Sequence, residues 1–203
     1  MPGFVGAWLF GYTDDMSTAA TITTADELFR MPDDGRRYEL REGELRMMSP
    51  SGSEHAIVIG EITWRLGQYI HQHRLGSIFG AEAGFLIARN PDTVLAPDVA
   101  FARQGQLDAI GIPKSFFPEA PALVVEVVSP SDTVEQVDAK MSRWLAVGVE
   151  LAWVVHPVGR TITIYRSLND IRVLTENDVL SGDDVIQGFA CRVGDLFTGL
   201  SKS

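Results

Sequence analysis

Apolar residues spaced three or four apart predict two long amphipathic helices in this chain. The first helix is expected to continue to about residue 74, and its apolar stripe is formed by Ile59, Ile62, Leu66 and Ile70. The second is expected to begin at a cap on Ser131 or Asp132, with Glu135 completing a capping box, and to end at Gly148. Its stripe is formed by Val134, Val137, Met141 and Leu145. A short helix is also predicted after Thr24.

Apolar runs between these helices predict the strands of a sheet. Residues 38–48 are typical of a hairpin that turns at 42–43, and we expect this hairpin to open the sheet. Residues 78–88 and 94–101 are expected to pair antiparallel, followed by a loop over 105–113. Residues 122–128 form the expected central strand. Strands at 151–155 and 161–165, with an edge strand at 171–175, then complete an α/β or α+β sandwich.

Length and composition favour one globular domain. The chain has 203 residues, of which 45% are hydrophobic and 22% charged. We expect residues 1–16 to be a loosely ordered N-terminal arm and 17–203 a single domain. The one cysteine, Cys191, excludes an internal disulfide and a Cys-based zinc site. No run of 18 apolar residues and no signal peptide is present, so we expect a cytoplasmic protein with no membrane partner.

The charge balance restricts the kinds of partner. With 17 basic and 27 acidic residues the net charge is −10 at pH 7, so the surface as a whole repels polyanions. This argues against tight non-specific binding of nucleic acid. The chain has only three lysines, Lys114, Lys140 and Lys202, so each lysine position is informative.

Glu126 is the strongest anomaly in the sequence, because it interrupts an otherwise apolar strand. An ionised carboxylate in that position costs several kcal/mol to desolvate unless a partner compensates it. One interpretation is structural, an ion pair with an arginine or a side chain that reaches water at the strand end. The interpretation that we favour is functional.

Asp98 is a second acid within an apolar run, directly after Pro97. Because proline opens or bends a strand, Asp98 is either an ordinary aspartate at a strand start or a functional partner of Glu126. Two carboxylates in a partly dry site suit Mg²⁺, which prefers one or two carboxylates and keeps several waters. We predict that Asp98 and Glu126 lie on adjacent strands and face one cleft.

Lys140 lies on the helix that follows the Glu126 strand. At 100° per residue it borders the buried stripe, so its ammonium can lean toward the sheet. The common alternative is a lysine whose stem packs along the helix while its charge reaches water.

Three further residues are accessory candidates for the same cleft. His55 lies on the inward side of the first long helix, in its first turn, although a structural histidine is the commoner case there. Glu82 and Glu44 either point into the cleft or face solvent. The arginines near the first hairpin could touch phosphate, but their alternation with glutamates is more typical of a neutralised surface; they are Arg36, Arg37, Arg41 and Arg46.

Taken in order along the chain, these motifs resemble the Uma2 family. The resemblance rests on Pro97-Asp98, on Glu126 within 124–132, on Lys140 and on the run 148–155. It extends over about residues 23–197 through Tyr38-Glu39-Leu40, Gly43-Glu44-Leu45, Ser49-Pro50-Ser51 with His55, and Gly188-Phe189. Uma2 is a branch of the PD-(D/E)XK nuclease superfamily. The resemblance therefore implies an α/β, restriction-endonuclease-like fold with a central mixed β-sheet flanked by helices.

The resemblance also implies an activity, a metal-dependent endonuclease that hydrolyses phosphodiester bonds of nucleic acid. Asp98 and Glu126 match the motif acids that hold Mg²⁺ or Mn²⁺, with a main-chain carbonyl next to Glu126 as a further ligand, and Lys140 matches the lysine that this branch supplies from the helix. Val128 stands where the superfamily usually has its lysine, and His156 stands where the family usually has aspartate. DNA is the expected substrate and a homodimer the expected assembly.

Two other functions stay open at this point. A non-catalytic binding or regulatory module can use the same fold, because fold does not fix function. A structural subunit could instead pair its apolar strands across a dimer interface, and exposed aromatic residues such as Trp153 or Phe116-Phe117 could contribute to that contact. Metal-dependent cleavage of a nucleic acid separates the first hypothesis from both.

Overall fold

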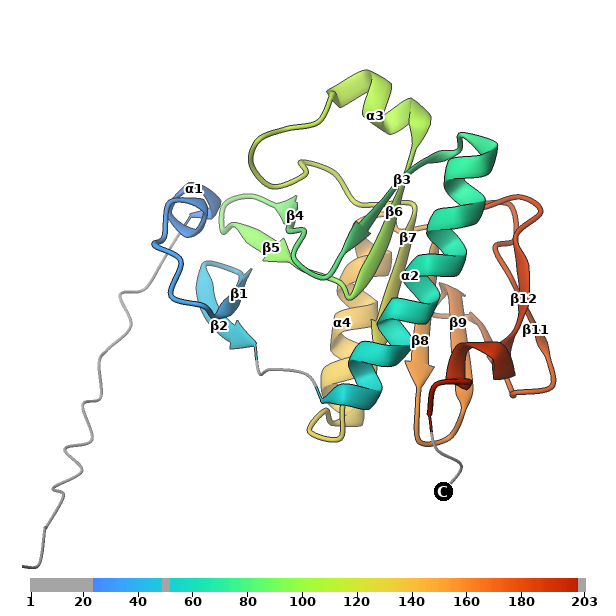
Figure 1. The fold of residues 1–203 in the computed structure, drawn as a ribbon. Helices are drawn as coiled ribbons and strands as arrows, with labels where there is room; N and C mark the ends of the chain where they lie inside the picture. The colour runs from blue at the N-terminus through green and yellow to red at the C-terminus, as the bar shows by residue number, and fades with distance from the viewer. Residues whose placement is uncertain (1–23, 49–51, 201–203) are drawn as a thin grey trace, which may run out of the picture.

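A computed structural model describes residues 24–48 and 52–200 of the chain (Figure 1). The predicted N-terminal arm, residues 1–16, and the Ser49-Pro50-Ser51 loop lie outside the described residues, so the division into arm and domain remains a prediction. Within the described part, no helix combines the length and the apolarity needed to cross a membrane.

The central element is a six-stranded sheet with the order β10-β9-β8-β7-β6-β3. In chain order its strands are β3 (Gly76–Gly80), β6 (Val99–Arg103), β7 (Leu123–Val127), β8 (Leu151–His156), β9 (Thr161–Ser167) and β10 (Asp170–Leu174). The neighbours β7 and β8 pair parallel, whereas the other neighbours pair antiparallel. The predicted central mixed sheet is therefore confirmed.

Two long helices cover opposite faces of this sheet (Figure 1); they are α2 (Ser53–His73) and α4 (Val134–Ala146). Successive side chains of a strand point to opposite faces, and β7 follows this rule. Val125 packs in the cluster that contains Ile62 of α2, whereas Val124 packs in the cluster that contains Trp144 of α4. The same alternation directs Glu126 to the face that α4 covers.

The first hairpin does not open this sheet, contrary to prediction. It belongs to a second sheet of four strands with the order β2-β1-β5-β4. These strands are β1 (Arg37–Arg41), β2 (Glu44–Met48), β4 (Phe85–Ala88) and β5 (Thr93–Leu95). A third, small core holds them to the short helix α1 (Ala25–Phe29), which begins at the predicted Thr24 capping box.

The predicted antiparallel pair over 78–88 and 94–101 is divided between the two sheets. β3 pairs with β6 in the central sheet, and β4 pairs with β5 in the second sheet. Pro97 lies where the chain passes from β5 to β6, and it has no N–H to continue a ladder. Asp98 therefore lies at the junction of the two sheets, directly before β6.

The second long helix begins differently from the prediction. Its cap is Thr133, whose side chain accepts the Gln136 N–H at 3.3 Å, because the Asp132 carboxylate accepts the Ser129 N–H instead. Val134 is 72% exposed and lies outside the buried stripe, whose fully buried members are Met141 and Trp144.

Four elements were not predicted. The expected loop after residue 103 contains a helix, α3 (Gln104–Ile110), whose Leu107 is buried and whose Gly105 obscured the helical pattern. The C-terminal part forms the strands β11 (Val179–Ser181) and β12 (Ala190–Arg192) and the 3-10 helix η1 (Val193–Phe197). Their apolar residues complete the core on the α2 side of the sheet.

The aromatic residues proposed for a dimer contact are not exposed. Trp153 is 1% exposed on the central strand β8, and Phe117 is buried beside Phe85. Phe116 is half-buried. The expectation that Trp153 and Phe117 are exposed is therefore wrong, because both side chains pack in the core, whereas dimerisation itself stays a prediction.

Candidate functional site

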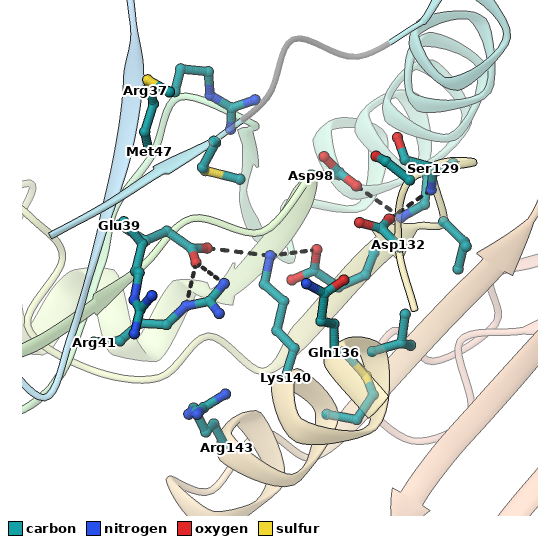
Figure 2. A pocket seen from close by; sticks show the side chains of 18 of the residues that line it. Arg37, Glu39, Arg41, Met47, Asp98, Ser129, Asp132, Gln136, Lys140 and Arg143 are labelled. Atoms are coloured by element: carbon teal, nitrogen blue, oxygen red, sulfur yellow. Dashed lines mark hydrogen bonds and ion pairs between the residues drawn. The ribbon is translucent and has the colours of Figure 1, made fainter. Parts of the chain in front are cut away.

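The carboxylates of Asp98 and Glu126 lie beside one cavity. β6 and β7 are adjacent and antiparallel, so the start of β6 lies next to the end of β7. The Val127 N–H on β7 donates a hydrogen bond of 2.8 Å to Asp98 Oδ2, which links the two segments directly. Both acids line a cavity of about 600 Å³ between the hairpin β1–β2 and helix α4 (Figure 2).

Glu126 is buried, and both of its oxygens accept hydrogen bonds from α4. Lys140 Nζ donates to Oε2 at 2.8 Å, and Trp144 Nε1 donates to Oε1 at 3.0 Å. Burial raises the pKa of Glu126 to about 7 even though the Lys140 charge opposes the rise, and the charges of Asp98 and Glu39 add to it. Near neutral pH this carboxyl is therefore divided between its ionised and protonated forms.

Lys140 is held between two carboxylates from different parts of the chain. Its ammonium lies 2.8 Å from Glu126 Oε2 and 3.3 Å from Glu39 Oε1. A dashed line in Figure 2 marks the ion pair between Lys140 and Glu39. Burial lowers the pKa of Lys140, but the charges of Glu126, Glu39 and Asp98 outweigh burial and raise it above its usual value. The ammonium therefore stays protonated.

Glu39 is a site residue that the sequence reasoning missed. It is 0% exposed, its Oε1 accepts the Ala96 N–H at 3.1 Å, and its Oε2 accepts two hydrogen bonds from Arg41. Burial alone would raise its pKa, but the charges of Lys140 and Arg41 and these hydrogen bonds hold it below the usual value. The available signal was the alternation of β1, which puts Glu39 on the face opposite the buried Leu40.

His55 contacts the other acid of the site. It is buried in the first turn of α2, and its Nε2 lies 3.3 Å from Asp98 Oδ2. Burial lowers its pKa, but the hydrogen bond and charge of Asp98 outweigh burial and raise it. Its Nδ1 is buried without a hydrogen-bond partner among residues 24–48 and 52–200. The ring lines the cavity, on the inward side of the helix as predicted.

The two accessory glutamates differ in position. Glu44 lines the cavity, where it forms an ion pair with Arg46. Glu82 is exposed in the turn between β3 and β4, pairs with Arg37 at 3.4 Å, and is not part of the cavity lining. The structure therefore does not bring Glu82 to Asp98 and Glu126.

His156, the residue at the expected aspartate position, lies at the end of β8 beside a neighbouring hollow. Its Nε2 is 3.3 Å from Thr163 Oγ1, and burial lowers its pKa. It does not line the cavity of Asp98 and Glu126.

The charges and donors of the cavity suit a divalent cation. Among the described residues, no group of three or more His, Cys, Asp or Glu side chains is arranged to hold a metal. Mg²⁺ needs only one or two carboxylates with waters, so Asp98 and Glu126 are the residues that could hold it. Among the described residues, three buried acids, Glu39, Asp98 and Glu126, contact two permanently cationic side chains, Lys140 and Arg41, and His55 pairs with Asp98. This excess of negative charge contributes to the high pKa of Glu126, and a bound cation would offset it.

Comparisons with known proteins give a family model and a similar solved structure. The model of the Uma2 family, described as "Putative restriction endonuclease", matches residues 25–194. The solved structure is described as a "putative nuclease belonging to DUF820" from Anabaena variabilis ATCC 29413. It is 18% identical, covers 86% of this chain and 97% of its own, and has a TM-score of 0.74, so it shows the same fold. A search of curated proteins found no match.

Proposed function

The chain belongs to the Uma2 family, and from this membership and its cavity we propose that it is a metal-dependent endonuclease that hydrolyses phosphodiester bonds. The family and the nuclease-like fold support a nuclease-type role. One observation carries the finer proposal: Asp98, Glu126 and Lys140, from three separate segments, line one cavity.

Asp98 and Glu126 are the residues that would hold Mg²⁺ or Mn²⁺. Their carboxylates are hard oxygen ligands, and the buried acids around them carry more charge than the nearby cations neutralise. Lewis-acid stabilisation of the charge that develops on the phosphate is the chemistry that the metal supplies when bound. The Val127 N–H and His55 hold Asp98 in place, and Trp144 fixes the plane of the Glu126 carboxylate.

Lys140 supplies a permanent positive charge beside these acids. A protonated ammonium in a partly dry cavity stabilises negative charge on a phosphate more strongly than it would in water. Glu39 acts as a positioning residue, because its carboxylate lies 3.3 Å from the ammonium and is itself fixed by Arg41 and the Ala96 N–H. The hairpin β1–β2 thus helps to set the position of a side chain on α4.

The cavity is less acidic than the chain as a whole, because five basic side chains line it beside six acidic ones, and a bound cation would favour a polyanion further. Its basic residues are Arg37, Arg41, Arg46, Lys140 and Arg143. We propose DNA as the substrate, on the strength of the family, and a homodimer as the active assembly, since two sites are needed to cut both strands of a duplex.

A non-catalytic binding module is the second candidate function. One observation favours it: both oxygens of Glu126 already accept hydrogen bonds within the protein, from Lys140 and Trp144. A carboxylate satisfied in this way can serve as a structural ion pair without any metal.

Cleavage of a panel of labelled single- and double-stranded DNA and RNA in Mg²⁺ or Mn²⁺ tests the proposal. We expect Lys140→Ala to abolish cleavage, and Lys140→Arg to restore little because a planar guanidinium does not replace a compact ammonium. Lys114→Ala is the matched control, since Lys114 is exposed outside the cavity. Full activity in Lys140→Ala would remove the lysine from the mechanism. No cleavage of any substrate by the unmutated protein would favour the binding module.

A further inference from the structure

The four arginines of the cavity are not equivalent. Arg41 donates two hydrogen bonds to Glu39, and Arg46 pairs with Glu44. Arg37 donates to the Ala81 carbonyl and pairs with Glu82. These three charges are therefore compensated by neighbours on the hairpin or near it. These pairs agree with the sequence of the first hairpin, where the alternation of arginine and glutamate indicates a neutralised surface.

Arg143 differs from the other three. Among the residues that the structure describes, its guanidinium has no hydrogen bond and no ion pair, although the side chain is half-buried and lines the cavity (Figure 2). A guanidinium carries five donors in a rigid fork that matches the oxygens of a phosphate. An uncompensated arginine in a cavity whose centre is acidic is therefore a candidate for ligand binding.

The position of Arg143 on α4 relates it directly to the site. Residues three or four apart share one face of a helix, and Gln136, Lys140 and Arg143 follow this spacing. All three line the cavity. Arg143 lies about 4.5 Å beyond Lys140 along the helix axis, at about 1.5 Å per residue. The two charges lie on one face of α4 at different heights along its axis, so they can contact two different phosphates of one strand.

We propose that Arg143 binds a backbone phosphate adjacent to the phosphate that Lys140 contacts. This inference rests on the proposed function and specifies how the substrate lies: one strand runs along the polar face of α4, between that helix and the β1–β2 hairpin. The contact recognises the phosphodiester backbone and not the base, so Arg143 contributes affinity and register without sequence preference.

Binding of short fluorescein-labelled oligonucleotides, followed by anisotropy in EDTA, tests the inference. The parent protein is Glu126→Gln, which lowers the excess negative charge and prevents cleavage under the proposed mechanism. We expect Arg143→Ala in this parent to weaken binding about 10- to 100-fold, the loss typical of a charged hydrogen bond. The slope of log K against log salt should fall by about 0.7 to 0.9. Arg143→Lys should recover part of the affinity.

The matched control is Arg192→Ala, because Arg192 is exposed on β12 outside the cavity and its removal changes the net charge equally. A second arm replaces single phosphates of the oligonucleotide by neutral methylphosphonates. At one position of the oligonucleotide, this replacement should weaken binding to the parent protein but should not weaken binding to Arg143→Ala. Thermal unfolding of Arg143→Ala should match the parent, since the guanidinium has no partner to lose within residues 24–48 and 52–200.

The possible outcomes distinguish a failure of the Arg143 contact from a failure of the proposed endonuclease function. If the parent binds an oligonucleotide and Arg143→Ala binds it equally well, or if Arg192→Ala loses as much affinity, the phosphate contact is refuted while the nuclease proposal stands. If cleavage by the unmutated protein and binding by the parent are both absent for DNA and RNA, the proposed function fails and the inference fails with it.

Discussion

The protonation of Glu126 should make the unfolding free energy of this protein depend on pH. The substitution Glu126→Gln should remove this contribution to the pH dependence. Glu126→Gln replaces the carboxyl by a neutral group of nearly the same shape. The amide oxygen can still accept the Trp144 hydrogen bond, and Lys140 keeps its second carboxylate, Glu39. The amide NH2 then faces the Lys140 ammonium, and this contact between two donors lowers stability by the same amount at every pH. The substitution therefore removes the titration of residue 126 with little change in packing.

The magnitude follows from the position of this pKa. It is 4.5 for an ordinary glutamate and about 7 for Glu126 in the folded chain. Each tenfold change in proton affinity corresponds to about 1.4 kcal/mol, so Glu126 disfavours the folded state by about 3 kcal/mol once it is ionised. Because the folded state holds the proton more tightly, this cost is absent below about pH 4.5 and increases as pH rises through about 7.

Urea unfolding over a series of pH values measures the effect. We expect the unfolding free energy of the unmutated protein, relative to that of Glu126→Gln, to fall by about 3 kcal/mol from about pH 4 to about pH 8. Other acids titrate in both proteins and cancel in the difference. Mg²⁺ should restore much of the lost stability at pH 8 in the unmutated protein only, because a cation favours ionised Glu126.

A difference that stays constant over this range would refute the reasoning. It would mean that the Lys140 ion pair and the Trp144 hydrogen bond already stabilise ionised Glu126 fully. A Mg²⁺ response of equal size in Glu126→Gln would show that the cation binds elsewhere.

Three further changes have defined outcomes. Trp144→Phe, which leaves Glu126 Oε1 without its buried donor, should lower the unfolding free energy by about 1 to 3 kcal/mol in urea titrations; an unchanged midpoint would contradict the importance of that hydrogen bond. Glu39→Gln should move the pH-dependent loss of stability to lower pH, because the Glu39 charge helps to raise the pKa of Glu126; the same unfolding series measures it, and an unshifted profile would contradict it. Deleting residues 1–15 should leave Tm unchanged in calorimetry, and a large loss of Tm would show that this segment contributes to the fold.

The sequence alone determined the local features of this protein. Glu126 stands out because strand β7 is otherwise apolar, and the period-2 alternation of the strand fixes its face. The spacing of Ile62, Leu66 and Ile70 fixes the buried side of α2, and this places His55 inward. These features depend on neighbours within a few residues of one another, which is the range over which periodicity and capping act.

Only the tertiary structure decided which distant residues meet. Glu39 contacts Lys140 because the hairpin forms a second sheet that stands across the cavity from α4, and the alternation within β1 gives no indication of that partner. The division of the predicted strand pair around Pro97 is also a tertiary result. The physical reason is that pairing between strands and burial of a charge depend on contacts between segments far apart in sequence. Whether a charge has a partner is likewise decided only when those segments are assembled; Arg143 has none in the part of the chain that the structure describes.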